Sequence, residues 1–153
     1  MNIANTHHFV GEYHKCIELY GQALQLANDT GAARLAGNIR GNLGLIYQLV
    51  GEYEQAIESF ELALQSAREL GNKHSAGTNL GNLANTYLLL GDYEKARTHY
   101  DRSLESARET GDKRQEGIFL GCLGELHVKM GQTHEATNHL QNAIAICDQV
   151  VPP

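Results

Sequence analysis

The sequence LGNLANTYLLLGDYEKARTHYDRSL, residues 80–104, contains two helical patterns separated by a glycine, and it decides the fold. Its first half carries residues at i, i+3, i+4 and i+7, the spacing of one helix face: Leu80, Leu83, Ala84 and Tyr87. Its second half repeats such a stripe with Tyr93, Ala96, Tyr100 and Leu104. The glycine between the halves, Gly91, suits a left-handed helix C-cap. The stretch therefore predicts two helices joined by a tight turn.

The same pair of patterns recurs along the chain with a period of forty residues. Glycines keep this period in four registers, and the first of these contains Gly11, Gly51, Gly91 and Gly131. A fifth register holds small residues, which predict close approach of a neighbouring helix: Gly44, Ala84 and Gly124. Residues 51–90 and 91–130 are identical at 15 of 40 positions. A fixed period of this length indicates a stacked repeat array.

Each period is predicted to contain a first-type helix, which precedes the Gly91 register, and a second-type helix, which follows it. First-type helices are expected near 33–49, 73–89 and 113–129, with a fragment at 2–9, and second-type helices near 12–29, 52–69, 92–109 and 132–149. The chain is thus predicted to be a single array over 1–153, with a partial repeat at 1–10, a helix at 12–29 and pairs at 33–69, 73–109 and 113–149. Because the pattern begins in the middle of a repeat, we expect a piece of a longer array.

These units resemble the tetratricopeptide repeat. The match is carried by Leu83-Ala84 with Tyr87, then by Gly91-Asp92-Tyr93, Ala96, Tyr100 and Leu104. The resemblance implies an all-α α-solenoid, a right-handed superhelix of antiparallel helix pairs whose first-type helices line a concave groove. The period is forty rather than about 34 residues, and each unit lacks the usual closing proline, so longer helices are expected. Such forty-residue units are similar to those of the Pins-related polarity adaptors and the kinesin light chains.

Composition narrows the class of protein. The net charge of -6 disfavours general binding to nucleic-acid phosphates. The sequence has no apolar run of about eighteen residues, so no membrane span is expected, and its start lacks the pattern of a signal peptide. Its cysteines are an odd number without metal-ligand spacing, Cys16, Cys122 and Cys147, which favours reduced thiols in a cytoplasmic protein.

Charge separates between the two helix types. First-type helices carry six basic and two acidic residues, a net of +4: Arg34, Arg40, Lys73, Lys113, Arg114 and Lys129 against Glu116 and Glu125. The remainder of the chain carries six basic and sixteen acidic residues, a net of -10. If the first-type helices line a groove, it is neutral to basic and favours a neutral to acidic peptide partner. Alternatively, these charges are simply solvated.

One polar register stands out on the first-type helices. Asn2, Asn42 and Asn82 are equivalent, and Cys122 breaks the series, while Asn5 and Asn85 share a second register. An asparagine side chain can pair with both the C=O and the N–H of an extended peptide. We therefore expect Asn2, Asn5, Asn42, Asn82 and Asn85 to bind a peptide backbone, with Arg40 as a further contact. The alternative is that these asparagines make hydrogen bonds on the helix surface or between repeats.

The resemblance supplies a parallel for this asparagine series. It is similar to the asparagine ladder in the groove of the O-GlcNAc transferase repeats, whereas the lysines of the chaperone-binding carboxylate clamp are missing. No catalytic triad, carboxylate pair or phosphate loop is present, so neither an enzyme nor a cofactor is expected. The histidines lack the i, i+4 spacing of a zinc helix and are expected on the surface, so no metal site is predicted. The function expected is that of a non-enzymatic scaffold that binds an extended peptide.

The end of the sequence suggests a different function. Ile144, Ile146, Val150 and Val151 follow the last apolar stripe with no further helix in the sequence to cover them. An uncovered apolar end of a solenoid is a candidate surface for self-association. An assembly module is therefore the alternative to peptide binding, and a regulatory domain of a larger signalling protein is a third reading.

Overall fold

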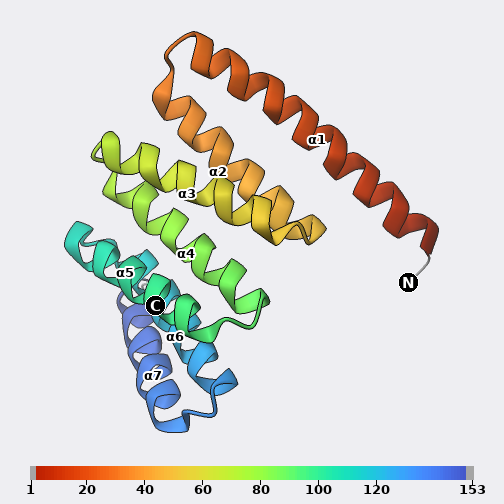
Figure 1. The fold of residues 1–153 in the computed structure, drawn as a ribbon. Helices are drawn as coiled ribbons and strands as arrows, with labels where there is room; N and C mark the ends of the chain where they lie inside the picture. The colour runs from red at the N-terminus through yellow and green to blue at the C-terminus, as the bar shows by residue number, and fades with distance from the viewer. Residues whose placement is uncertain (1–2, 151–153) are drawn as a thin grey trace. The chain divides into compact units, whose positions relative to one another are not determined.

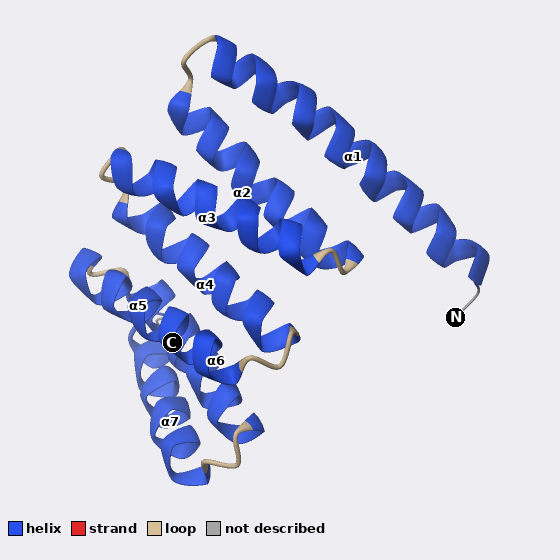
Figure 2. Ribbon diagram, in the orientation of Figure 1, coloured by secondary structure: helices blue, strands red, loops and turns tan. Residues whose placement is uncertain are grey.

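The computed structural model describes the backbone of residues 3–150 and the side chains of residues 12–150. Within this range the chain forms α-helices joined by short turns and has no β-strand (Figures 1 and 2). The expected all-α fold class is confirmed. The chain divides into two compact units, Met1–Gly71 and Asn72–Pro153.

The first unit consists of α1 (Ile3–Asp29), α2 (Ala33–Val50) and α3 (Tyr53–Glu69). The helix α2 packs against both α1 and α3. Its contact with α1 is an apolar cluster built on Ala27, Ala36, Ile39 and Leu43. Its contact with α3 depends on Gly44, where an added Cβ atom would lie 2.6 Å from Cε1 of the buried Phe60. The small-residue register therefore does what its recurrence predicts, because it admits a large ring from the neighbouring helix.

The start of the chain differs from the sequence prediction. A fragment at 2–9 and a separate helix at 12–29 were expected, with a turn at Gly11, but α1 is one helix from Ile3 to Asp29. A glycine inside a helix costs only about 1 kcal/mol relative to alanine. An isolated helix of about eight residues is unstable in water, and continuing the helix keeps the backbone hydrogen bonds that a turn would interrupt.

The second unit consists of α4 (Lys73–Leu89), α5 (Tyr93–Thr110), α6 (Lys113–Lys129) and α7 (Thr133–Val150). Its core gathers Tyr100 and Leu104 from α5 with Leu120, Leu123 and Leu126 from α6. Two glycines admit neighbouring side chains here. A Cβ atom on Gly124 would lie 2.6 Å from Cγ of Leu140, and one on Gly81 would lie 2.5 Å from Cε1 of Phe119.

The turns between the helices repeat one design. Each contains a glycine with φ between 64° and 84°, the left-handed region that other residues avoid: Gly31, Gly51, Gly71, Gly91, Gly111 and Gly131. The following helix often begins at a side-chain cap, as where Asp92 Oδ1 accepts from the backbone N–H of Lys95 at 3.2 Å. The bounds of α2 to α7 differ from the predicted ranges by at most one residue at either end.

Candidate functional site

One side of α2 forms an exposed stripe in the first unit. It consists of five exposed residues at i, i+4, i+8, i+11 and i+15, which fall on one side of the helix: Arg34, Asn38, Asn42, Leu45 and Leu49. Polar side chains occupy its N-terminal half, and the two leucines, 41% and 66% exposed, occupy its C-terminal half. The opposite side of α2 is buried. The stripe can therefore offer amide hydrogen bonds and an apolar contact to the same ligand.

The asparagines predicted to bind a peptide differ in exposure and in whether the structure describes their side chains. Asn42 is exposed in the stripe, and no hydrogen bond holds its side-chain amide among residues 12–150. Asn2 lies outside the described residues, and Asn5 lies in α1 with its side chain outside the described part. Asn42 lies in the first unit and Asn82 in the second.

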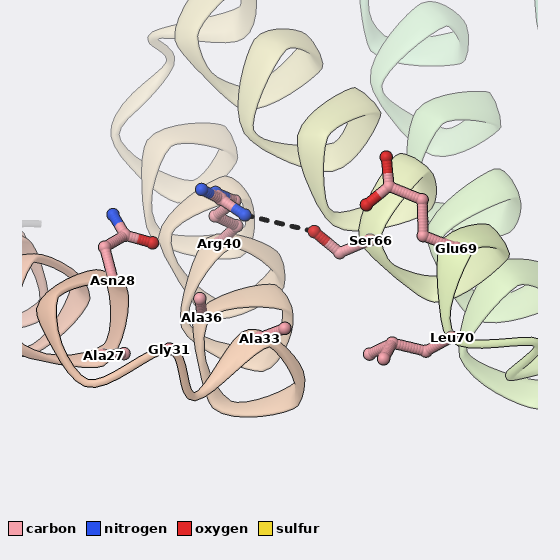
Figure 3. A pocket seen from close by; sticks show the side chains of 9 residues that line it. All are labelled: Ala27, Asn28, Gly31, Ala33, Ala36, Arg40, Ser66, Glu69 and Leu70. Atoms are coloured by element: carbon pink, nitrogen blue, oxygen red, sulfur yellow. Dashed lines mark hydrogen bonds between the residues drawn. The ribbon is translucent and has the colours of Figure 1, made fainter.

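Arg40 does not join Asn42, which corrects its predicted place in a common groove. Two residues along a helix turn the side chain by about 200°, so positions 40 and 42 face opposite ways. Arg40 Nη1 instead donates to Ser66 Oγ of α3 at 3.1 Å, and Arg40 is partly buried (Figure 3). It lines a pocket between α1, α2 and α3 that also contains Ala36 and Glu69.

The second unit places Asn82 and Asn85 on α4, and both side chains are half-buried. The Tyr100 hydroxyl of α5 donates to Asn85 Oδ1. Tyr100 is only 1% exposed, and burial, with a further contribution from Cys122, raises its pKa, so the phenol stays protonated and remains a donor. A peptide N–H would therefore compete with the Tyr100 hydroxyl for Asn85 Oδ1. The Nδ2–H groups of Asn85 can still donate to a peptide carbonyl.

A sequence signal for this pair exists and is easily missed. Asn85 and Tyr100 are fifteen residues apart, and the equivalent pair one period earlier is Leu45 and Phe60. Leu45 therefore pairs with phenylalanine, which has no hydroxyl, and Asn85 pairs with tyrosine, which has one. The first period repeats the polar pair as Asn5 and Tyr20 in sequence. Asn85 is therefore the hydrogen-bond partner of a buried phenol on α5. Because α4 and α5 form the predicted pair 73–109, this bond lies within one repeat, and the sequence had left open only bonds on the helix surface or between repeats.

Cys122 of α6 contacts this pair without becoming a nucleophile. It is half-buried, and burial raises the pKa of its thiol, with the Glu125 carboxylate raising it further. A thiol with a raised pKa is neutral near pH 7 and unreactive. Among the described residues, no group of three histidine, cysteine or acidic side chains has a metal-binding arrangement.

Ion pairs neutralise part of the basic charge on the first-type helices. Lys73 Nζ lies 2.9 Å from Glu109 Oε2. Lys113 Nζ and Arg108 Nε approach the buried Glu116 carboxylate at 2.7 and 2.9 Å, and these two cations lower its pKa. Glu116 is already counted in the net charge of +4, so of these pairs only Lys73–Glu109 neutralises a first-type cation with an acid from another helix, and Arg108 adds a cation beside the first-type residue Glu116.

Two histidines correct the expectation that all histidines lie on the surface. His127 of α6 is buried, and its ring stacks on His139 of α7 with centroids 5.1 Å apart. The His127 Nδ1 atom lies 2.6 Å from Gln132 Oε1. Burial and the neighbouring His127 lower the pKa of His139, so His139 is neutral near pH 7, and the stacked rings form part of the packing between α6 and α7.

The residues predicted to mediate self-association also divide. Ile144 is 62% exposed on α7, and Val150 is exposed as well. Ile146 instead packs against the core of the second unit, where its Cγ2 would lie 3.3 Å from a Cβ atom on Gly117. It is therefore not part of an uncovered surface. Val151 lies outside the described residues.

Comparison with known families decides the identity. A family model of the tetratricopeptide repeat matches residues 1–69, 35–109 and 75–149, nearly the whole chain. The chain belongs to the tetratricopeptide repeat family. Its repeats are those of a protein-interaction scaffold, and the tetratricopeptide repeat is in general a non-enzymatic module. No helix among the described residues is both long and apolar enough to cross a membrane.

Solved structures share the tetratricopeptide fold. BtubC (BKLC) from P. vanneervenii is 21% identical with a TM-score of 0.82, over 94% of this chain and 60% of that one. A putative kinesin light chain from Podosopora anserina, whose TPR-like repeats are nearly identical to one another, is 18% identical to this chain. Its TM-score is 0.75, over 98% of this chain and 74% of that one. The apo form of RapI is 14% identical, with a TM-score of 0.65 over 91% and 63%. No curated protein matches the sequence.

Proposed function

We propose that this tetratricopeptide repeat chain is a scaffold that binds an extended peptide segment along the exposed stripe of α2. The observation that carries the proposal is the stripe itself, five exposed residues on one face with amides at one end and leucines at the other. An asparagine amide matches the hydrogen-bonding groups of an extended backbone. Leu45 and Leu49, exposed in the same stripe, add an apolar contact to the hydrogen bonds of the asparagine amides.

The chemistry of the stripe defines the partner. Arg34 favours an acidic residue at one end, and Leu45 and Leu49 favour an apolar side chain at the other. The partner is therefore a peptide that is neutral to acidic and carries one bulky apolar residue. Within the second unit, Asn82 and the side-chain N–H groups of Asn85 on α4 offer the same kind of hydrogen bond. The cysteines are free, which supports a reducing compartment such as the cytoplasm.

Replacing stripe residues tests this function. Peptides selected from a random library on the intact chain serve as probes, and calorimetry measures their Kd. Asn42→Ala should weaken binding about fivefold, because one net hydrogen bond contributes about 1 kcal/mol. Leu49→Ala should weaken binding about tenfold through lost apolar contact. Helical circular dichroism should stay unchanged, because both side chains are exposed.

Matched controls come from the same chain. Asn142 of α7 and Leu62 of α3 are exposed residues of the same types outside the stripe. Their alanine variants should bind the selected peptides as tightly as the original chain. If Asn42→Ala and Leu49→Ala also bind normally, the stripe is not the peptide site.

A second candidate function is self-assembly through α7. Leu104 and Ala107 of α5 are buried in a core that includes residues of α6. The residues forty positions later, Ile144 and Cys147 of α7, occupy the same registers. Their own surface is exposed. A second copy of the chain could cover this face, as could a further repeat.

Sedimentation tests the assembly reading. The weight-average mass should rise with concentration, and Ile144→Glu should weaken association at least tenfold, because it places a charge in an apolar contact. Leu35→Glu changes an equally apolar exposed residue of α2 and should leave association intact. A strict monomer at high concentration would reject self-assembly without affecting the peptide-binding proposal.

A further inference from the structure

Arg40 occupies a position that belongs to the core in the other repeats. The residues one and two periods later are Leu80 and Leu120, and both are buried. A guanidinium in this register is unexpected, because a charged group placed in an apolar slot needs a polar partner. In the first unit the partner is a single neutral hydroxyl, Ser66 Oγ.

The space in front of Arg40 is open because the surrounding residues are small. A pocket of about 260 Å³ lies there between α1, α2 and α3 (Figure 3). Its wall includes Ala33, whose equivalent one period later is Lys73, and Lys73 forms an ion pair with Glu109. The pocket also includes Asn28 and Ala36, whose equivalents two periods later, Arg108 and Glu116, pair with each other.

The second unit therefore fills these positions with paired long side chains, and the first unit leaves them empty. Because these side chains are short in the first unit, Arg40, the basic residue among those that line the pocket, is open to a ligand. No ion pair of Arg40 is formed within the part of the chain that the structure describes. A guanidinium has five N–H donors, and Ser66 uses one of them.

Arginine and a carboxylate form the strongest hydrogen-bonded pair available to such a fork. We propose that this pocket binds the carboxylate of an aspartate or glutamate side chain carried by a protein partner. Arg40 donates to the carboxylate oxygens, and Asn28 can donate from the α1 side. Ala27, Ala36 and Leu70 contact the methylene groups of the incoming side chain.

The size of the pocket favours a side chain over a whole small molecule. Small-molecule sites usually enclose about 300 Å³ or more and bury most of the ligand. This pocket is smaller, and much of its rim, including Asn28, Ala33 and Leu70, is exposed. A side chain of a protein that is already bound elsewhere on this chain enters the pocket as an intramolecular step. It therefore loses less translational freedom than a free small molecule, and a shallow site is sufficient to bind it.

This pocket is separate from the exposed stripe of α2. Arg40 and Asn42 face opposite sides of the helix, so the two sites can be tested independently. The Glu69 carboxylate on the pocket rim accepts a hydrogen bond from Gln65 at 2.8 Å and opposes an incoming anion. Its removal should therefore tighten binding of a carboxylate.

NMR titration with N-acetyl-glutamate N-methylamide tests the proposal. We expect saturable shifts of the Arg40 side-chain Nε–H and of the Gly31 and Ala36 amides, with a Kd in the millimolar range. The glutamine analogue should cause none of these shifts. Arg40→Leu installs the residue of the other repeats and should abolish binding, and Glu69→Gln should tighten it about threefold.

A second variant keeps the test decisive if Arg40→Leu alters the fold. Ala33→Glu leaves Arg40 in place and adds a second carboxylate to the pocket wall that already carries Glu69, so it should weaken carboxylate binding about threefold. The proposal is overturned if the capped glutamate gives no saturable shift, if the glutamine analogue binds equally, or if Ala33→Glu binds normally. Equal binding of free acetate or succinate would overturn the assignment to a protein side chain. Asn42→Ala should leave this titration unchanged.

Discussion

Gly81→Val should destabilise the second unit by about 3 kcal/mol, the upper end of the cost of overpacking a core. A Cβ atom on Gly81 would lie 2.5 Å from Cε1 and 3.1 Å from Cζ of Phe119. The ring cannot easily withdraw, because Phe119 is buried within the core of the second unit. Urea unfolding followed by circular dichroism measures the loss. The helix-propensity gain of valine over glycine offsets only a few tenths of this cost.

The same register provides the control. Gly121 is one period from Gly81, also lies inside a helix, and has nothing within 4 Å of an added Cβ atom. Gly121→Val should therefore change stability by no more than about 0.5 kcal/mol. Phe119→Ile, which installs the shorter residue found at Ile39, should recover part of the loss in Gly81→Val. Equal destabilisation by the two valine variants would contradict the packing argument.

The Asn85–Tyr100 hydrogen bond should show strong coupling. Asn85→Leu should cost about 2 kcal/mol, because it leaves a buried hydroxyl without its acceptor. Tyr100→Phe should cost about 1 kcal/mol, because Asn85 is half-buried and can exchange its partner for water. The double variant should lie within about 1 kcal/mol of the original, because replacing both partners by apolar groups is nearly neutral. It also reproduces the Leu45 and Phe60 pair of the first unit.

A double-mutant cycle in urea measures this coupling. Additive losses would mean that the hydrogen bond contributes nothing specific. The cycle also separates structure from binding. If Asn85 serves only Tyr100, the double variant binds a selected peptide normally. Weaker binding by this stable double variant would assign Asn85 to the peptide site.

The period predicted most of the fold because it fixed the turns. A glycine with positive φ recurs every twenty residues from Gly31 to Gly131, and each one ends a helix that cannot continue past it. Helix bounds therefore followed from glycine positions alone. The exception is Gly11, which lies inside α1. Sharing a register with the turn glycines did not determine its conformation, because a glycine is also tolerated inside a helix at a cost of about 1 kcal/mol.

The candidate site was predicted less well, although several errors were avoidable. The opposite directions of Arg40 and Asn42 follow from helix geometry. The fifteen-residue pairing of Asn85 with Tyr100 was visible across periods. Ile146 shares a register with Ser66, which approaches Gly37, so its contact with Gly117 could also be inferred.

Other features needed coordinates. Phe119 reaches Gly81, and His127 stacks on His139, through the relative rotation of two helices. No spacing within one helix reports that rotation. The emptiness of the Arg40 pocket likewise depends on which neighbouring side chains fill the space, although the small size of Ala33 was visible in sequence.

Within each unit, the main packing joins helices that are consecutive in the chain. Contacts therefore form across short sequence separations, and each turn brings the next partner into place with little loss of loop entropy. Chains with such low contact order fold in microseconds to milliseconds. Nucleation can begin at any helix pair and spread to its neighbours, so a helix at the edge can detach and reattach while the others stay folded.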